Sequence, residues 1–164
     1  MSVLLLPDLI LPALTDLTPE LLHGQGIDLL MMDFDNTIVP YTTSVPTEAM
    51  EQFLRALSDA GIDYCVVSNS KKPRVVTFCQ KYGIPVFTHA KKPFSRGIRQ
   101  ALAAYPQAKH PALVGDQIYT DVLGANAQGL TSILVKPIHL HIWPLKLRHW
   151  VELPWIAIRK LKKE

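Results

Sequence analysis

Two acidic side chains that follow an apolar run are the part of this chain best suited to chemistry. Residues 29–32 are all leucine or methionine, and Asp33, Asp35 and Thr37 come directly after them. Such a run is typical of a strand buried on both faces, and residues two apart on an extended chain point the same way. We therefore expect Asp33 and Asp35 to meet at the carboxyl end of this strand, where open α/β sheets bind their ligands.

Five more polar residues come at or shortly after the ends of later apolar runs: Ser68, Asn69, Lys92, Asp116 and Asp121. The carboxyl ends of parallel strands lie along one edge of a sheet, so these residues can share one site with the first two acids. Several carboxylates at that edge repel one another unless they hold a hard cation. Mg²⁺ fits, because it binds carboxylate, water and phosphate oxygens. A hydroxyl, a lysine and the helix N-terminus after Ser68 suit phosphate.

Each of these signals also has an explanation without chemistry. The two acids of the first run can belong to a solvated turn, Ser68 can be a capping serine, and Lys92 can be a surface lysine. Asp116 and Asp121 can be helix-capping and first-turn acids. Because independent signals arrive in order at successive strand ends, we interpret them together as one site.

Apolar runs and helical patterns alternate along residues 28–136. The expected strands are 29–32, 64–67, 84–87, 112–114 and 132–135, and the expected helices are about 46–60, 73–82, 94–105 and 120–128. This alternation predicts an α/β fold of three layers, with a mostly parallel, Rossmann-like central sheet and helices on both faces. We expect one domain over 1–164, made of a core at about 28–136, an apolar N-terminal arm (1–27) and a C-terminal extension (137–164).

The composition places the chain among globular proteins. Of its 164 residues, 48% are hydrophobic and 19% charged, which argues against disorder. The net charge of +3 is too mild to indicate nucleic acid by itself. Cys65 and Cys79 lie in apolar patterns and are expected to be reduced core residues. The N-terminus has no basic segment before its apolar residues, so we expect neither a signal peptide nor a spanning helix. The expected location is the cytoplasm, with the option of peripheral membrane contact.

The two ends of the chain leave alternatives open. The leucine-rich arm either packs on the domain or docks on something apolar. The extension interleaves three tryptophans with basic residues, which suits the headgroup zone of an anionic membrane or stacking on single-stranded nucleic acid. The remaining alternative is that the tryptophans pack on the domain. The tryptophans are Trp143, Trp150 and Trp155, and the nearby His139, His141 and His149 are too loosely spaced to indicate a metal site.

The motifs together resemble those of the haloacid-dehalogenase-like (HAD) phosphatases over about residues 28–136. The matching segments are Asp33-Phe34-Asp35-Asn36-Thr37, Val66-Val67-Ser68-Asn69, Lys92, and Gly115-Asp116 through Asp121. Within these phosphatases the chain is most similar to the YqeG branch, itself similar to mitochondrial phosphatidylglycerophosphate phosphatases. Neither gap between the first three motifs has room for an inserted cap domain, so an open site is expected.

The resemblance implies a mechanism that the residue types also support. Asp33 would attack phosphorus and form an aspartyl-phosphate, and Asp35 would act as general acid and then general base. Mg²⁺ would be held by Asp33, Asp116 and the backbone carbonyl of Asp35, with Asp121 supporting the metal shell or positioning Lys92. The residues expected to bind phosphate oxygens are Ser68, Lys92, Thr37 and Asn69.

The predicted function is therefore a magnesium-dependent phosphatase with an open site. The resemblance favours phosphatidylglycerophosphate, converted to phosphatidylglycerol in phospholipid biosynthesis, with an anionic lipid headgroup as partner. One alternative is a phosphatase for a phosphoprotein or a nucleic-acid 3′-phosphate end. Another is a non-catalytic module that docks on a membrane or ribosome, against which the intact pair of acids argues.

Overall fold

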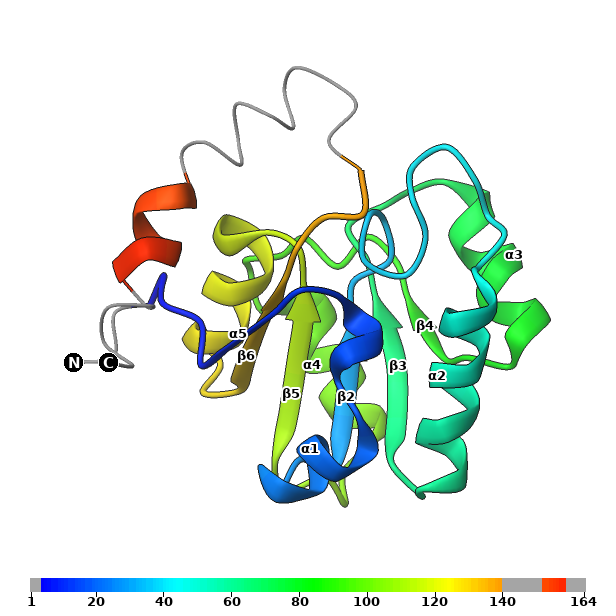
Figure 1. Ribbon diagram of the computed structural model, residues 1–164, viewed down its shortest axis with the longest axis horizontal. Coiled ribbons are helices and arrows are strands. Elements are labelled where there is room, and N and C mark those ends of the chain that lie inside the picture. Colours follow the sequence, from blue (N-terminus) through cyan, green and yellow to red (C-terminus); the bar gives the residue numbers. More distant parts are fainter. Residues whose placement is uncertain (1–3, 140–151, 159–164) are drawn as a thin grey trace.

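A computed structural model describes residues 4–139 and 152–158 of the chain. Its centre is a sheet of six parallel strands in the order β1-β6-β5-β2-β3-β4, seen in Figure 1. The strands are β1 (Leu9–Leu11), β2 (Leu29–Met32), β3 (Asp63–Val67), β4 (Val86–Phe87), β5 (Pro111–Gly115) and β6 (Thr131–Val135). β2, which leads to Asp33, pairs with β3 on one side and β5 on the other. The first acidic motif therefore leaves the middle of the sheet.

Helices cover both faces of this sheet. They are α1 (Pro19–Gly24), α2 (Glu48–Asp59), α3 (Pro73–Tyr82), α4 (Arg96–Ala104) and α5 (Leu123–Ala127), with a π-helix at Ile118–Val122 and a 3₁₀ turn at Leu14–Asp16. Leu30 and Met32 of β2 pack in one core cluster with α1, α2 and α3, whereas Leu29 and Met31 pack with α4 and α5. This period-two alternation confirms the predicted three-layer α/β fold.

Local signals set the helix ends. The Thr47 hydroxyl accepts a hydrogen bond from the Met50 N–H at 3.2 Å, so α2 begins after Thr47 rather than at the expected Pro46. Pro73 occupies the first turn of α3, and Gly83, at φ 66°, ends it in the left-handed conformation. The predicted helix with Phe94 on its apolar stripe is wrong at its start. α4 begins at Arg96, and Phe94 lies in the preceding turn, 74% exposed.

The N-terminal arm is part of the domain. β1 pairs with β6 at the edge of the sheet, and the Asp8 carboxylate accepts a hydrogen bond from the Ser132 N–H at 2.9 Å. Leu14, Leu17 and Leu22 are buried in the core. Of the two alternatives that the sequence left open, packing on the domain is the one observed for the described part of the arm.

The connections between the motifs are short. One loop and α2 join β2 to β3, and α3 and β4 lie between β3 and Lys92. Within the continuous stretch 4–139, the structure contains no inserted cap domain, as predicted. Residues 152–158 form a short helix whose Trp155 and Ile156 pack against the same small cluster as Leu5 and Ile10, made of Ile118, Val122 and Leu134.

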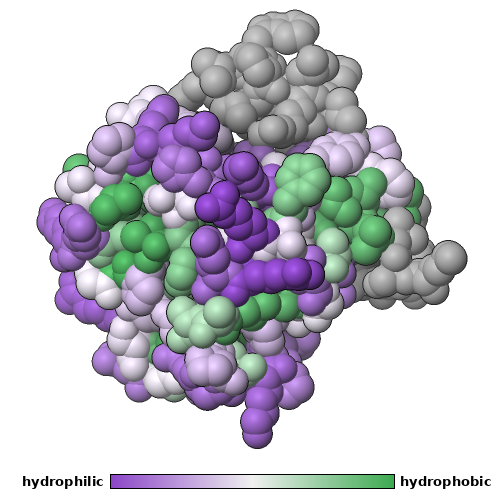
Figure 2. Space-filling model, turned by 180° about the vertical axis from the view of Figure 1, so that it is seen from behind, coloured by the Kyte–Doolittle hydropathy of each residue, from purple (hydrophilic) through white to green (hydrophobic). Residues whose placement is uncertain are grey.

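The surface behind the view of Figure 1 is chemically mixed. A hydrophilic band runs across its centre between two hydrophobic areas, one of which borders residues drawn in grey (Figure 2). Of the helices in 4–139 and 152–158, none has the length and hydropathy needed to cross a bilayer.

Candidate active site

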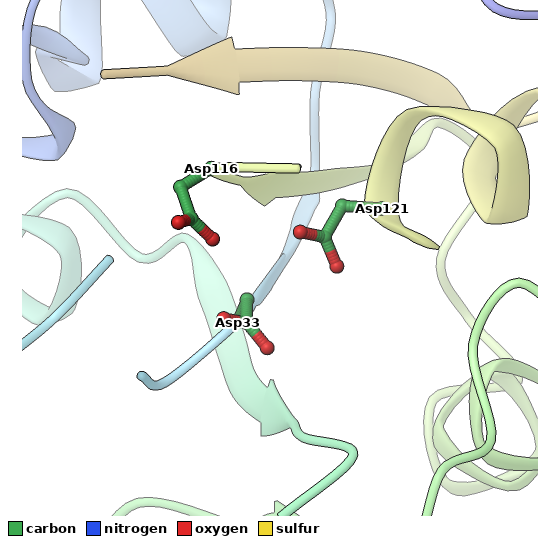
Figure 3. Close-up of side chains that lie close together, drawn as sticks. All are labelled: Asp33, Asp116 and Asp121. Atoms are coloured by element: carbon green, nitrogen blue, oxygen red, sulfur yellow. The ribbon is translucent and has the colours of Figure 1, made fainter. Parts of the chain in front are cut away.

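Three aspartates from two neighbouring strand ends converge at the carboxyl edge of the sheet. Asp33 follows β2, Asp116 follows β5, and Asp121 lies in the π-helix after β5. Each offers a carboxylate oxygen within 4.8 Å of the other two, and all three residues are buried. Figure 3 shows the three side chains pointing toward one another. The structure therefore brings together three of the four predicted metal-binding residues through their side chains.

Lys92 lies in the same cluster. Its Nζ is 2.7 Å from Asp33 Oδ1 and 2.7 Å from Asp121 Oδ1, and its side chain is only 1% exposed. Asn69 holds the lysine backbone from β3: Lys92 N–H donates to Asn69 Oδ1 at 2.7 Å, and Asn69 Nδ2 donates to the Lys92 carbonyl at 2.9 Å. Both polar atoms of the Asn69 amide thus bind the lysine, so the contact observed for Asn69 positions Lys92.

The cluster has more negative than positive charge. Burial, together with the neighbouring Asp121 and Asp35, raises the pKa of Asp33 to about 6 although Lys92 opposes the rise. Burial and the charges of Asp33 and Asp121 raise the pKa of Asp116 well above its ordinary value. Burial alone would lower the pKa of Lys92, but Asp121 and Asp33 together raise it. Added positive charge would therefore stabilise the deprotonated form of each carboxylate.

The donor set fits a hard divalent cation. Asp116 Oδ1 is buried and has no hydrogen-bond partner, and it lies in the group of three carboxylates whose oxygens can reach one ion. Mg²⁺ prefers oxygen ligands from a small number of carboxylates and leaves positions for water and phosphate oxygens. Asp33, Asp116 and Asp121 are therefore the residues that could hold it.

Gly115 permits the close approach of Asp121. A Cβ at this position would lie 2.2 Å from Asp121 Oδ2 and 2.7 Å from the Asp121 Cβ, so any larger residue would displace the carboxylate. Asp121 Oδ2 also accepts the Gln117 N–H at 3.2 Å. The predicted helix at 120–128 begins earlier than expected, as the π-helix Ile118–Val122 that carries Asp121, and continues as α5.

Asp35 has a different partner from Asp33. Its carboxylate forms an ion pair with Arg74 of α3, whereas Asp33 pairs with Lys92. The prediction that the two acids point the same way assumed an extended chain, but β2 ends at Met32, before both acids. The general acid expected from the sequence is therefore held by Arg74 and not by Lys92.

The two predicted hydroxyl groups are both buried near these strand ends. Ser68 follows β3, and its oxygen accepts the Ser70 N–H at 3.1 Å, which leaves its own proton free to donate. Thr37 Oγ1 is buried without a hydrogen-bond partner. Their binding of phosphate stays a prediction.

The sequence analysis assigned no role to three residues around the site: Arg74, Asn36 and Glu152. Arg74 occupies the first turn of α3, where the helix dipole disfavours a cation. This unfavourable placement was the signal that could have indicated a nearby carboxylate partner. The Asn36 amide donates to the His139 carbonyl at 2.6 Å and accepts the His139 N–H at 3.0 Å. Glu152 is buried, and its Oε1 accepts the Ile118 N–H at 2.9 Å. Residues from the C-terminal part of the chain thus form hydrogen bonds with the loop that follows Asp35 and with the π-helix that carries Asp121.

The C-terminal predictions are only partly covered by the structure. Trp155 Nε1 donates to the Tyr119 hydroxyl at 3.3 Å, so this tryptophan packs on the domain. Trp143, Trp150, His141 and His149 lie outside the described residues.

Comparison with known proteins shows the family of this chain. A family model described as mitochondrial PGP phosphatase matches residues 2–139. The probable phosphatase YqeG of Bacillus subtilis (strain 168) is 33% identical over 134 residues, which cover 81% of this chain and 78% of that protein.

One solved structure is also similar to part of the chain. It is the crystal structure of glycerol phosphate phosphatase Rv1692 from Mycobacterium tuberculosis in complex with magnesium. The match has 18% identity and a TM-score of 0.25, and it covers 73% of this chain and 47% of that one. The chain thus spans about half the length of that structure. On the family model and the YqeG relative, the chain belongs to the mitochondrial PGP phosphatase family, in the YqeG-like branch of the HAD-type phosphatases.

Proposed function

We propose that this protein is a magnesium-dependent phosphatase that converts phosphatidylglycerophosphate to phosphatidylglycerol. The observation that carries the proposal is the buried group of Asp33, Asp116 and Asp121 around Lys92, in a chain of the mitochondrial PGP phosphatase family. This arrangement holds a carboxylate nucleophile, a place for a divalent cation and a fixed ammonium in one small volume. Those are the parts that phosphoryl transfer to a carboxylate requires.

Asp33, Asp116 and Asp121 would hold Mg²⁺. The ion supplies positive charge that offsets the repulsion between the nucleophile and the incoming phosphate. Asp116 has the unpartnered oxygen, and Asp121 both faces the cluster and contacts Lys92, so it serves the two roles that the resemblance left as alternatives.

Asp33 attacks phosphorus, and the bond from phosphorus to the leaving oxygen breaks as the bond to the aspartate forms. Lys92, already held by Asn69, remains beside the nucleophile and donates to the transferring oxygens. The Ser68 and Thr37 hydroxyl groups supply neutral donors to the same oxygens. Because these groups are buried and held before substrate binds, little reorganisation is needed during the reaction.

Asp35 gives a proton to the leaving alcohol oxygen and later takes one from the attacking water. Water then breaks the bond between phosphorus and Asp33, which releases inorganic phosphate and regenerates the carboxylate. In the structure Asp35 contacts Arg74, so it must turn toward the leaving oxygen when substrate is present.

The surroundings of the site support a phosphate presented on a lipid surface. Val45 and Phe94 are 71% and 74% exposed, in the loops that follow Asp35 and Lys92. Leu153 and Ile158, on the short C-terminal helix, are also exposed. In sequence this helix is followed by Arg159-Lys160-Leu161-Lys162-Lys163, which would favour an anionic membrane. We propose that the protein works in peripheral contact with such a surface.

Phosphate release in the presence of Mg²⁺ tests this function. The substrates are phosphatidylglycerophosphate in mixed micelles, a phosphopeptide and a 3′-phosphorylated oligonucleotide, with Asp33→Asn as the blank. We expect strong preference for the lipid and no turnover by Asp33→Asn, whose fold should persist because the side chains have nearly the same shape. If the protein hydrolyses the other substrates but not the lipid, the lipid assignment is wrong. If Asp33→Asn retains a tenth of the wild-type rate, Asp33 is not the nucleophile.

A further inference from the structure

We propose that Arg74 binds the phosphodiester group in the leaving half of the substrate and thereby selects phosphatidylglycerophosphate over simple glycerol phosphates. This inference rests on the proposed function, because it assumes that Asp35 protonates a phosphatidylglycerol leaving group. It adds a specificity-determining residue to a site whose phosphate-binding groups are all on the side of the scissile phosphate.

The position of Arg74 relative to Asp35 is the first observation. Arg74 Nη2 contacts Asp35 Oδ1 directly, and Asp35 is the residue that must reach the leaving oxygen. Whatever is attached to that oxygen is therefore expected close to the guanidinium. In phosphatidylglycerophosphate the attached group is a glycerol whose other end carries a phosphodiester. The two terminal oxygens of an extended glycerol are about 5 Å apart for single bonds near 1.5 Å, so the phosphodiester lies within reach of a group in contact with Asp35.

The second observation is that several contacts hold Arg74 in place without using all of its hydrogen-bond donors. Nη1 donates to the Thr43 carbonyl at 2.6 Å and lies 3.4 Å from the Pro40 carbonyl. The guanidinium carbon lies 5.2 Å from the centre of the Phe34 ring. Together with the contact to Asp35, these interactions use at most three of the five N–H donors of an arginine, and Nε is buried without a partner.

The chemistry of the remaining donors fits a phosphodiester. A guanidinium offers parallel N–H groups that match two oxygens of a phosphate. Arg74 also stands in the first turn of α3, where backbone N–H groups and the helix dipole favour an anion. When the phosphodiester takes the guanidinium, Asp35 loses its partner and is free to turn to the leaving oxygen. Substrates without this group leave Asp35 paired with Arg74.

The test compares two soluble substrates, so that membrane binding does not enter. One is glycerophosphoglycerol phosphate, the deacylated form of the lipid, and the other is glycerol 3-phosphate, which lacks the phosphodiester. Both are measured with Mg²⁺ for the full chain and for Arg74→Met and Arg74→Lys. The matched control is Lys72→Met, which removes an exposed positive charge just before α3.

We expect Arg74→Met to lower kcat/KM for glycerophosphoglycerol phosphate about 30-fold more than for glycerol 3-phosphate, a factor typical of charged hydrogen bonds. Arg74→Lys should restore part of this preference, and Lys72→Met should leave the ratio of the two substrates unchanged. Equal losses on both substrates, with the preference of the wild type retained, would overturn the inference and show that Arg74 only holds Asp35. A wild type that hydrolyses glycerol 3-phosphate but not the deacylated lipid would instead contradict the proposed function, and the inference with it.

A binding measurement keeps the test independent of turnover. Glycerophosphoglycerol, the product without its terminal phosphate, should bind to Asp33→Asn. Binding should weaken about 30-fold when Arg74→Met is added, and by a smaller factor when Arg74→Lys is added. Unchanged affinity in both double variants would overturn the proposal even if one Arg74 variant folds poorly.

Discussion

Two cation–carboxylate groups with different surroundings organise this site. Lys92 pairs with Asp33 and Asp121 at 2.7 Å each, and the three side chains are at most 11% exposed. Arg74 pairs with Asp35 where the side chains are 18% and 13% exposed. Both groups are therefore largely buried, but Lys92 compensates two carboxylates, whereas Arg74 compensates one, is slightly more exposed and keeps unused donors. We therefore expect Lys92 to keep its partners when substrate binds, and Arg74 and Asp35 to exchange theirs.

This difference has an energetic consequence. Removing one partner from a buried ion pair leaves an uncompensated charge, which costs about 3–5 kcal/mol. Loss of Lys92 leaves two buried carboxylates without their counter-charge, whereas loss of Arg74 leaves one. The Lys92 group should therefore contribute to folding as well as to catalysis. The Arg74 pair should contribute mainly to substrate selection.

The largest expected effect comes from removing Lys92. In metal-free protein, Lys92→Met should lower the free energy of unfolding by about 3 kcal/mol or more, because Asp33 and Asp121 lose their buried counter-charge. Arg74→Met should lower it by less than Lys92→Met does, because only one carboxylate loses its counter-charge. Urea unfolding of the two variants and the wild type measures both values. In the presence of Mg²⁺, Lys92→Met should also reduce kcat by about 10²–10³-fold.

Equal losses of stability in the two variants would contradict the distinction between a cation that compensates two buried carboxylates and one that compensates a single carboxylate. The same conclusion would follow if Lys92→Met kept the wild-type stability without metal. Because a methionine has nearly the length of the lysine stem, the variant changes the charge with little change in packing.

A smaller effect is expected when pH and Mg²⁺ are varied together. The folded-state pKa of Asp33 is raised to about 6 from 3.8, and that of Asp116 is also raised. The native state thus binds protons more tightly than the unfolded state, and metal-free stability falls as pH rises from about 4 through 6. Mg²⁺ needs the deprotonated carboxylates. Its effect on Tm should therefore be larger at pH 7.5 than at pH 5, which thermal unfolding with and without the ion measures.

Asp116→Asn is the control for this pH dependence. It removes one of the mutually repelling charges, so the Tm of metal-free protein at pH 7.5 should rise by about 3 °C, the shift that roughly 1 kcal/mol produces in a domain of this size. The same variant should lose most of the stabilisation by Mg²⁺. A Mg²⁺ effect of the same size at both pH values, or one retained in Asp116→Asn, would contradict the assignment of the ion to this cluster.

The central part of the fold was predictable because its strands are continuous apolar runs followed by polar residues. Asp33, Asp116, Asp121 and Lys92 could be assigned to one site because parallel strands place their carboxyl ends on one edge. β1 was not predicted, since its three residues (Leu9–Leu11) are too few to show a pattern and stand between prolines. Its place depends on pairing with β6, more than 120 residues away in sequence.

The partners of the site residues were less predictable than the residues themselves. Asp35 has a different partner from Asp33 because β2 ends before both acids and α3 places Arg74 beside Asp35. The chain then turns at Asn36, whose positive φ is accompanied by hydrogen bonds with residues 138–139. The contact of Arg74 with Asp35 depends on how α3 packs over Phe34, and that of Glu152 with Ile118 on the docking of a distant helix. Such contacts arise from tertiary packing, which local patterns do not record.

Trapping the covalent intermediate tests the central claim most directly. Borohydride reduces an acyl phosphate but not a free carboxylate, so treatment during turnover should convert Asp33 to homoserine. Peptide mass mapping should find the change at position 33 only when Mg²⁺ and phosphatidylglycerophosphate are both present. Modification of another acidic residue, or continued turnover of this lipid with no reducible adduct at Asp33, would contradict the account.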